Sequence, residues 1–221
     1  MSRENEKTLE VYNRLASYYI SNRSRKHGEE PAKYAAKCEQ KKRRMTWYME
    51  GMSRNPSVLE IGSGAGDDVP MLRELGCRVQ PSDGAQAFVD ILQNKGYSPM
   101  LLDVSKKNQI SGFYDMIYAN HVFIHMTEGD LYRIMPKIYG SLRPKGRFIF
   151  NVGNIDAEGG RKSGWIDLPG FHHLGADRYF QYWKNTAIIT LVENNGFVVD
   201  KYQVYGGEDH RRWIEICAKK T

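Results

Sequence analysis

The chain has 221 residues, of which 41% are hydrophobic and 26% are charged, and this length suits one globular domain with a substantial core. No run approaches the roughly eighteen apolar residues of a membrane span, and the first ten residues lack the apolar segment of a secretory signal. We therefore expect a soluble cytoplasmic protein without membrane association. The cysteines Cys38, Cys77 and Cys217 are far apart and show no CxxC spacing, so they are expected to be free thiols rather than ligands of a zinc or redox site.

The excess positive charge lies at one end of the chain. Residues 1–56 contain 13 Lys and Arg against 7 Asp and Glu, and the rest of the chain carries 19 of each, so the net charge of +6 is entirely N-terminal. The run KKRR at residues 41–44 is its densest part. Such a segment can attract an anionic substrate or a phosphate backbone, but a basic helix face is more often simply exposed to solvent.

Residues 1–54 are expected to form an N-terminal helical cap, because apolar residues recur there at helical spacing. Two sets of residues each share one helix face: Leu9, Tyr12, Ala16 and Tyr19, and then Tyr34, Cys38, Met45 and Tyr48.

From Val58 onward, short β-rich runs alternate with helical stretches. Strands are expected near residues 57–62, 77–82, 98–103, 114–120, 146–152, 196–205 and 212–220, and helices near 68–75, 86–95, 127–142 and 185–194. Strands separated by helices predict an α/β fold with a mostly parallel sheet that is covered on both faces. The last two strands are too close together for a crossover helix, so they are expected to form an antiparallel hairpin at the sheet edge.

Residues 153–182 interrupt this alternation within the core, which we assign to residues 55–221. The segment is long and rich in aromatic residues and glycine, which indicates an inserted cap rather than a plain connection. Open α/β sheets bind their ligands at the carboxyl ends of the strands. We therefore expect both the N-terminal helices and this insertion to fold over that edge, with the insertion closing when ligand binds.

The stretch VLEIGSGAGDD at residues 58–68 ends the first strand in a glycine-rich turn. A P-loop would need Gly-Lys-Ser/Thr where the sequence reads Gly66, Asp67 and Asp68, and the third glycine of a dinucleotide fingerprint would fall at Asp67. Glu60, Asp67 and Asp68 would also repel a pyrophosphate. A ligand that carries positive charge and no phosphate fits better, and S-adenosylmethionine has a sulfonium, an α-ammonium and an adenosine.

Downstream acids agree with this reading. Asp83 ends the second strand 21 residues after Gly62, at the spacing where a carboxylate can accept both ribose hydroxyls. Asp103 ends the third strand and can accept the adenine amino group, while Val104 packs on the ring. These features, ExGxGxG at 60–66, YDMIYANHVFIHM at 114–126 and LRPKGRFIF at 142–150, resemble the class I S-adenosylmethionine-dependent methyltransferases over about residues 55–219.

The resemblance implies a Rossmann-like seven-stranded sheet with an antiparallel last strand. It also implies a set of cofactor-binding residues: Tyr12, Glu60, Gly62, Ser63, Gly64, Asp83, Gly84, Asp103, Val104, Asn120 and His121. Ser82 departs from the family, which more often has an apolar residue before the acid. His121 and His125 are four residues apart, but no acid or cysteine accompanies them, so we expect no metal site; the family often has a histidine near His125 for packing.

The acceptor is constrained mainly by what is absent. The fourth strand is followed by ANHVF rather than a (D/N)PP(Y/F) tetrad, which argues against methylation of the exocyclic amines of nucleic-acid bases, and there is no Pro-Cys pair that could attack a pyrimidine covalently. Methylation at an oxygen or nitrogen of a small-molecule metabolite or natural-product intermediate is therefore the expected function, and the N-terminal positive charge is compatible with an anionic substrate. If a general base is used, the candidates are His172, His173 and Tyr19, with Arg178 and Tyr179 as further polar residues.

Two alternatives stay open. A methyltransferase acting on RNA or another polyanion would use Lys41, Lys42, Arg43 and Arg44, although no RNA-binding module is evident. A non-catalytic binding protein is disfavoured by the intact acids. Residues 12–19 resemble the YDxxAxxY opening of many small-molecule members, with Asn13 in place of the aspartate. On that basis the first helix forms a wall of the acceptor pocket, and the basic run takes no part in it; the oligomeric state is left open.

Overall fold

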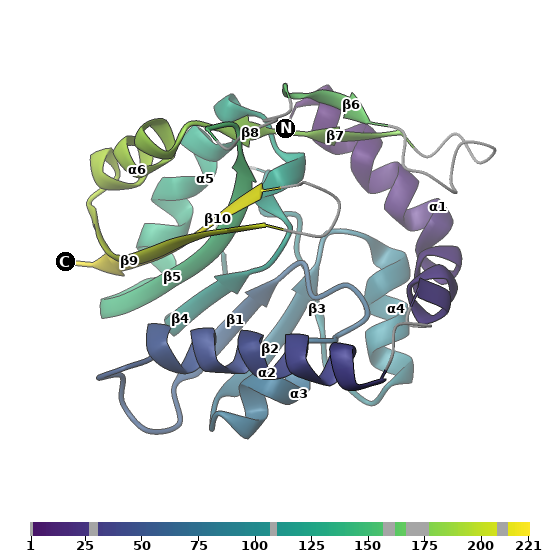
Figure 1. The fold of residues 1–221 in the computed structure, drawn as a ribbon, viewed down its shortest axis with the longest axis horizontal. Coiled ribbons are helices and arrows are strands. Elements are labelled where there is room, and N and C mark those ends of the chain that lie inside the picture. Colours follow the sequence, from purple (N-terminus) through teal and green to yellow (C-terminus); the bar gives the residue numbers. More distant parts are fainter. Residues whose placement is uncertain (1, 27–30, 107–109, 157–161, 167–176, 207–211) are drawn as a thin grey trace.

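The computed structural model describes residues 2–26, 31–106, 110–156, 162–166, 177–206 and 212–221, without the side chains of residues 19, 22–26 and 31. Figure 1 shows the fold. The helices are α1 (Arg3–Lys26), α2 (Pro31–Tyr48), α3 (Val69–Glu74), α4 (Gln86–Asn94), the 3-10 turn η1 (Phe123–His125), α5 (Glu128–Ser141) and α6 (Asn185–Asn194). The main-sheet strands are β1 (Ser57–Ile61), β2 (Arg78–Asp83), β3 (Met100–Leu101), β4 (Tyr114–Ala119), β5 (Leu142–Asn154), β8 (Tyr182–Trp183), β9 (Phe197–Gly206) and β10 (Arg212–Lys220).

The central sheet has the order β3-β2-β1-β4-β5-β10-β9, and the short strand β8 pairs with the end of β5. The strands from β3 to β5 are parallel to one another. β10 is antiparallel to both of its neighbours, β5 and β9. The expected α/β fold, its mostly parallel sheet and the antiparallel hairpin at the sheet edge are confirmed, with β9 as the edge strand.

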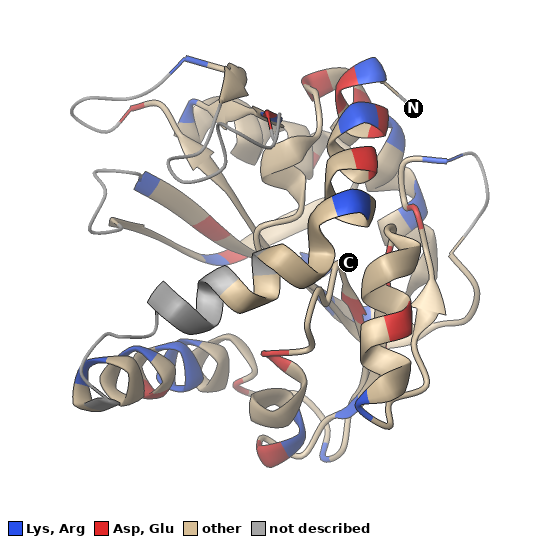
Figure 2. Cartoon of the chain, turned by 90° about the vertical axis from the view of Figure 1, so that its right-hand side faces the viewer, with Lys and Arg blue, Asp and Glu red and all other residues tan. Residues whose placement is uncertain are grey.

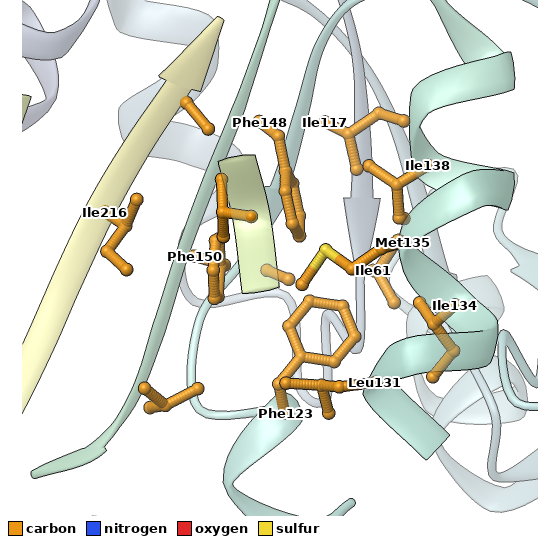
Figure 3. Close-up of a cluster of buried hydrophobic side chains, with 14 of the residues drawn as sticks. Ile61, Ile117, Phe123, Leu131, Ile134, Met135, Ile138, Phe148, Phe150 and Ile216 are labelled. Atoms are coloured by element: carbon orange, nitrogen blue, oxygen red, sulfur yellow. The ribbon is translucent and has the colours of Figure 1, made fainter. Parts of the chain in front are cut away.

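The two faces of the sheet carry separate apolar clusters, because successive residues of a strand point to opposite sides. On one face, strand residues such as Ile117 and Phe148 pack against Leu131, Ile134 and Ile138 of α5 (Figure 3). α6 joins the same cluster. On the other face, the alternate residues of the same strands pack against α2 and α3.

α2 corrects one expectation. Both N-terminal helices were expected over the carboxyl ends of the strands, but α2 lies against a face of the sheet, where Met45 and Tyr48 are buried with Met116 and Ile149. Its first half remains exposed, including Tyr34. The apolar stripe correctly predicts an amphipathic helix, but such a stripe does not specify which surface it covers.

α1 and the described strands of the insertion do lie together over the strand ends. β6 (Gly164–Ile166) and β7 (Arg178–Phe180) form a separate antiparallel pair, and Figure 1 shows it beside α1. The backbone N–H of Tyr179 donates to Thr8 Oγ1 at 3.2 Å, and Lys7 Nζ lies 4.4 Å from the centre of the Trp165 ring. Two segments far apart in the sequence thus form one cover.

Candidate functional site

One cavity of about 590 Å³ lies where the strands end beneath this cover. Every residue that the sequence predicted as a cofactor ligand lines it. Three elements outside the strand ends also contribute lining residues: α1 contributes Asn5, Thr8 and Leu9, α2 contributes Lys37 and Lys41, and β7 contributes Arg178 and Phe180. The arrangement matches the usual ligand position of open α/β sheets.

The glycine loop after β1 turns tightly against its neighbours. Gly62 and Gly64 have φ values of +68° and +54°, in the left-handed region that side chains with a Cβ rarely adopt. A Cβ on Gly62 would lie 2.4 Å from Val122 Cγ2, whereas one on Gly64 would meet no atom within 4 Å. The backbone of the loop is therefore bare where it borders the cavity.

Asp83 ties this loop to the end of β2. Its carboxylate accepts the backbone N–H of Gly64 at 2.9 Å and that of Ala85 at 2.8 Å. Burial raises the pKa of Asp83, and these backbone donors oppose the rise. Ser82, the residue that departs from the family pattern, is fully buried and donates to the carbonyl of Glu60 at 2.7 Å. Its hydroxyl is satisfied within the sheet, so it leaves the position of Asp83 undisturbed.

Glu60 is a buried acid that faces the cavity, and no cation among the described residues forms an ion pair with it. It is 3% exposed, and its Oε2 accepts the Ser63 hydroxyl at 2.9 Å. Burial, reinforced by the nearby charge of Asp68, raises the pKa of Glu60 to about 8. A positively charged ligand would restore the ionised form, so this position favours a cation.

Asp68 is held in the ionised form instead. It forms an ion pair with Lys41 and accepts hydrogen bonds from Asn120 at 3.0 Å and from Tyr118 at 3.1 Å. Burial alone would raise the pKa of Asp68, but Lys41 and these donors outweigh it, so the pKa is lowered. Lys41 also lines the cavity, so one residue of the basic run lies at the site, although nothing in the sequence indicated that it would lie there.

All four residues of the basic run are paired within the chain, although Figure 2 shows Lys and Arg gathered along α2. Besides the Lys41 pair, Lys42 contacts Glu74 at 2.8 Å and Arg43 contacts Glu39 at 3.2 Å. Arg44 contacts Glu215 at 3.0 Å, and the side chain of Glu215 is 4% exposed. The run thus neutralises acids of its own chain and is a poor candidate for docking a polyanion.

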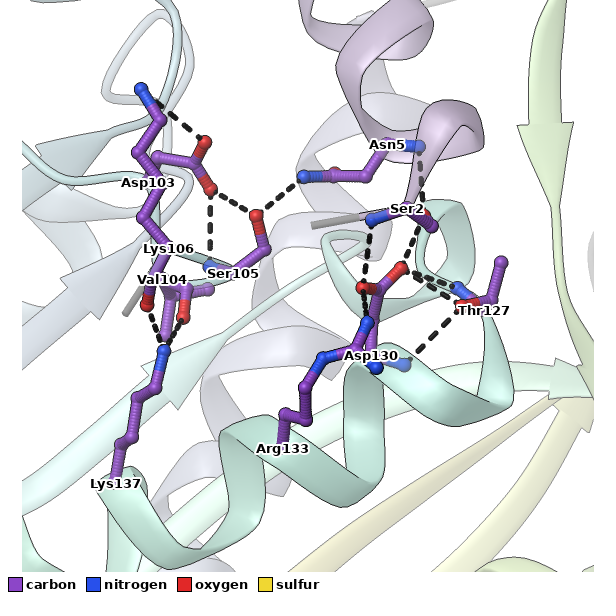
Figure 4. Close-up of polar contacts among 10 residues, drawn as sticks. All are labelled: Ser2, Asn5, Asp103, Val104, Ser105, Lys106, Thr127, Asp130, Arg133 and Lys137. Carbon is purple, nitrogen blue, oxygen red and sulfur yellow. Dashed lines mark hydrogen bonds and ion pairs between the residues drawn. The ribbon is translucent and has the colours of Figure 1, made fainter. Parts of the chain in front are cut away.

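Asp103 connects the cavity to the first turn of α1 (Figure 4). Its Oδ1 accepts the hydroxyl of Ser105 at 2.6 Å and the backbone N–H of Ser105 at 3.0 Å. Asn5 of α1 in turn donates to Ser105 Oγ at 2.8 Å. The backbone N–H of Ser2 also donates to the buried carboxylate of Asp130 at 3.1 Å. These polar contacts fix the start of α1 beside the third strand.

Asn120 and His121 are organised by Asn151, a residue that the sequence did not single out. Asn151 donates to Asn120 Oδ1 at 2.8 Å and accepts the backbone N–H of His121 at 2.6 Å. His121 has a φ of +59°, and its ring lies 4.7 Å from that of Trp213. A buried asparagine in a strand that is otherwise apolar was the signal available, because burial of a polar side chain requires partners.

Comparison with known proteins identifies the family. A family model described as a methyltransferase domain matches residues 19–202. The chain belongs to the methyltransferase domain family. It is an S-adenosylmethionine-dependent methyltransferase, as the glycine loop and the strand-end acids indicated. No sequence among the curated proteins matches it.

Solved structures share its fold. The 1,6-didemethyltoxoflavin-N1-methyltransferase of Burkholderia thailandensis is 19% identical with a TM-score of 0.67, over 100% of this chain and 92% of that one. The magnesium protoporphyrin IX methyltransferase of Synechocystis PCC 6803 is 16% identical with a TM-score of 0.70, over 99% and 100%. The N-methyltransferase NodS of Bradyrhizobium japonicum is 14% identical with a TM-score of 0.59, over 82% and 86%.

A second group of side chains in the methyltransferase, the Tyr12 cluster, consists of the polar residues Tyr12, His125 and Arg178 and the apolar Phe180. All four line the cavity. Tyr12 Oη lies 2.9 Å from His125 Nε2 and also accepts a hydrogen bond from Arg178. His125 Nδ1 donates to the carbonyl of Tyr179 at 2.7 Å. His125 was expected only to pack; it does pack against Phe180, with ring centres 4.7 Å apart, but it also belongs to this polar group.

The structure does not test the catalytic candidates. His172 and His173 lie outside the described residues, and so does the side chain of Tyr19. Among the residues that the structure describes, no three or more His, Cys, Asp or Glu gather as a metal site would require. In the same part of the chain, no helix is both long and apolar enough for a membrane span.

Proposed function

We propose that this methyltransferase transfers the methyl group of S-adenosylmethionine to an oxygen or nitrogen atom of a small-molecule metabolite or natural-product intermediate, and that it needs no metal ion. The observation that carries the proposal is a continuous cavity that joins the strand-end acids to the Tyr12 cluster. Its volume, about 590 Å³, lies within the usual range for small-molecule sites. The cover formed by α1 and β7 suits a compact acceptor better than a polymer.

The residues at the strand ends fit the chemistry of the cofactor. Glu60 supplies a carboxylate for the α-ammonium, and its raised pKa gives it a reason to bind a cation. Asp83 keeps lone pairs for the ribose hydroxyls, and the bare backbone beside Gly64 leaves room for close approach. Asp103 and Val104 serve the adenine. Lys37 and Lys41 line the same cavity and provide positive charge for the cofactor's carboxylate.

When bound, S-adenosylmethionine supplies a methyl group that is already activated by its sulfonium. The protein's task is then to align the acceptor and exclude water, and neither task calls for a Lewis acid. The structures of similar fold include two with small-molecule substrates in their names, a didemethyltoxoflavin and a magnesium porphyrin. They support a small-molecule acceptor here. The polyanion alternative receives no such support, because its four cations are paired within the chain.

Calorimetry of S-adenosylmethionine and S-adenosylhomocysteine tests the cofactor assignment. Asp83→Ala should weaken binding by about 1.5 to 3 kcal/mol, the range for a lost hydrogen bond to a charged group. Asp90→Ala is the matched control, since Asp90 is an exposed acid of α4 that accepts a hydrogen bond from Gln86 at 2.7 Å and is not among the cavity-lining residues. It should bind like the wild type, and a chelator should change neither affinity. Wild-type affinity in Asp83→Ala would remove Asp83 from the site.

A labelling experiment tests the acceptor class. The protein is incubated with methyl-labelled S-adenosylmethionine and a cell extract separated into small molecules, nucleic acids and proteins. We expect label in the small-molecule fraction, at an oxygen or nitrogen atom. Label confined to nucleic acid would favour the polyanion alternative.

A further inference from the structure

The Tyr12 hydroxyl is held from two sides by groups of opposite character. Arg178 donates to its oxygen and also places its guanidinium carbon 5.0 Å from the centre of the Tyr12 ring. On the other side, His125 Nε2 lies 2.9 Å from the same oxygen. A cation that donates and an imidazole nitrogen therefore meet at one phenol oxygen inside the cavity.

The backbone fixes the direction of these hydrogen bonds. The carbonyl of Tyr179 can only accept, so His125 Nδ1, 2.7 Å away, carries the hydrogen. The neutral imidazole then has an unprotonated Nε2, and the Tyr12 hydroxyl donates to it. The Tyr12 oxygen thus receives a hydrogen bond from Arg178 and directs its own hydrogen toward His125.

The surroundings of this oxygen favour negative charge. Phe88 packs on the Tyr12 ring with centres 5.9 Å apart, and Ile124 and Met126 also line the cavity. Arg178 is 6% exposed. In such an apolar setting a buried cation stabilises a nearby anion more strongly than it would in water, and it repels a positively charged acceptor such as a protonated amine.

We propose that Tyr12 is a catalytic residue that removes a proton from the acceptor, and that the acceptor is an aromatic or heteroaromatic compound with a weakly acidic O–H or N–H group. This inference rests on the proposed function and narrows it. The acceptor's O–H or N–H bond breaks and its electron pair stays on the acceptor atom. That proton binds to Tyr12 Oη as the phenolic hydrogen moves to His125 Nε2, leaving an imidazolium that later returns its proton to water.

The base strength of the Tyr12 and His125 pair determines which acceptors can lose a proton to it. A tyrosine and histidine pair matches acids that ionise near neutral pH, and it is too weak a base for an aliphatic alcohol. The anion that forms faces Arg178 and lies among aromatic side chains, which suits a flat, conjugated molecule. Arg178 and His125 act through Tyr12 and are positioning residues in this scheme.

4-Nitrophenol is the probe for this proposal, because its ionised form absorbs visible light and its neutral form does not. It is added to the protein loaded with S-adenosylhomocysteine, at a pH about one unit below its own midpoint in water. We expect the bound probe to be largely ionised in the wild type. Tyr12→Phe and Arg178→Met should lower the ratio of ionised to neutral bound probe about tenfold or more. Tyr18→Phe, on the same helix but outside the cavity lining, is the control and should behave like the wild type.

Nitrogen NMR of His125 follows the proton to its destination. Before the probe is added, Nδ1 should be protonated and Nε2 bare; with bound probe, both should be protonated, and this change should be absent in Tyr12→Phe. A bound probe that stays neutral, a probe that does not bind, or ionisation that persists in Tyr12→Phe would overturn the proposal. Calorimetry of S-adenosylhomocysteine distinguishes failure of the proposed function from failure of the role of Tyr12. If the wild type does not bind S-adenosylhomocysteine, the proposed function is rejected; if it binds normally but the bound probe stays neutral, only the role of Tyr12 is rejected.

Discussion

The two N-terminal helices have similar amphipathic patterns but different positions and tasks. α1 lies over the strand ends, where Asn5, Thr8, Leu9 and Tyr12 line the cavity. α2 lies on a face of the sheet, where Met45 and Tyr48 join the apolar core and Arg44 pairs with a buried acid. α1 therefore belongs chiefly to the site and α2 chiefly to the framework.

Lys41 is an exception to this difference between the two helices. It belongs to α2 and pairs with Asp68, yet it lines the cavity and lies close enough to influence the charge of Glu60. A basic run that resembles a polyanion patch in the sequence thus supplies one cation to the site and uses the others in ion pairs. The difference between the helices teaches that charge composition describes a surface only after the partners of the charges are known.

Removal of residues 1–25 should have the largest effect and would test whether α1 is separable from the framework. The truncated protein should lose all ionisation of bound 4-nitrophenol, because Tyr12 and much of the cover are missing. Its sheet should stay folded, since no described side chain of α1 belongs to the two main apolar clusters. Hydrogen exchange in β1, β4 and β5 checks this. Loss of protection throughout these strands would show that α1 is part of the framework after all.

Arg44→Met should give a large loss of stability. It leaves Glu215 buried without its cation, and breaking a buried pair costs about 3 to 5 kcal/mol. The free energy of unfolding in urea measures this. Arg43→Met is the control on the same helix, because its pair with Glu39 is exposed and should contribute roughly 0.5 kcal/mol or less. Equal losses in the two variants would refute the distinction between buried and exposed members of the run.

The number of protons released when the cofactor binds is expected to be a smaller effect than the two above, and it tests the charge state of Glu60, which Lys41 influences. The pKa of Glu60 is raised to about 8, so Glu60 is mostly protonated at neutral pH, and pairing with the α-ammonium should expel close to one proton. Calorimetry of S-adenosylmethionine at neutral pH in two buffers of different ionisation enthalpy measures this number. Glu60→Gln should release none.

Lys41→Met sharpens the same experiment. Lys41 lowers the pKa of Glu60, so its removal should keep Glu60 protonated to higher pH and weaken binding. Because the pKa of Glu60 is higher in the folded protein than in the unfolded chain, protonation of Glu60 favours folding. This contribution to the free energy of unfolding is fully present below the ordinary pKa of 4.5 and is lost as the pH rises through about 8. Unchanged proton release in Glu60→Gln would assign the proton to another group.

The sequence predicted the framework, and it predicted that the proposed cofactor residues lie together, because both depend on local rules. Strand ends in a parallel sheet meet at one edge, so Glu60, Asp83 and Asp103 could be placed together from their positions after three expected strands. Each of them lines the cavity. The helix expected near residues 127–142 likewise begins where predicted, because Thr127 and Asp130 form a capping box at the start of α5.

The rest depended on contacts between distant segments. Arg178 reaches Tyr12 across 166 residues, and nothing local in either segment marks the partner. His125 reads as a core residue from its apolar neighbours, because the carbonyl that orients it belongs to β7. The position of α2 was missed for the same reason: an apolar stripe predicts burial but does not identify the surface that it covers.

A crystal structure with bound S-adenosylhomocysteine would show whether the strand-end acids and the Tyr12 cluster form one site. We expect the ribose hydroxyls to bind Asp83, the α-ammonium to bind Glu60, and the sulfur to face the part of the cavity lined by Tyr12, Arg178 and His125. A ligand bound outside this cavity, or one whose sulfur faces away from the Tyr12 hydroxyl, would contradict this expectation.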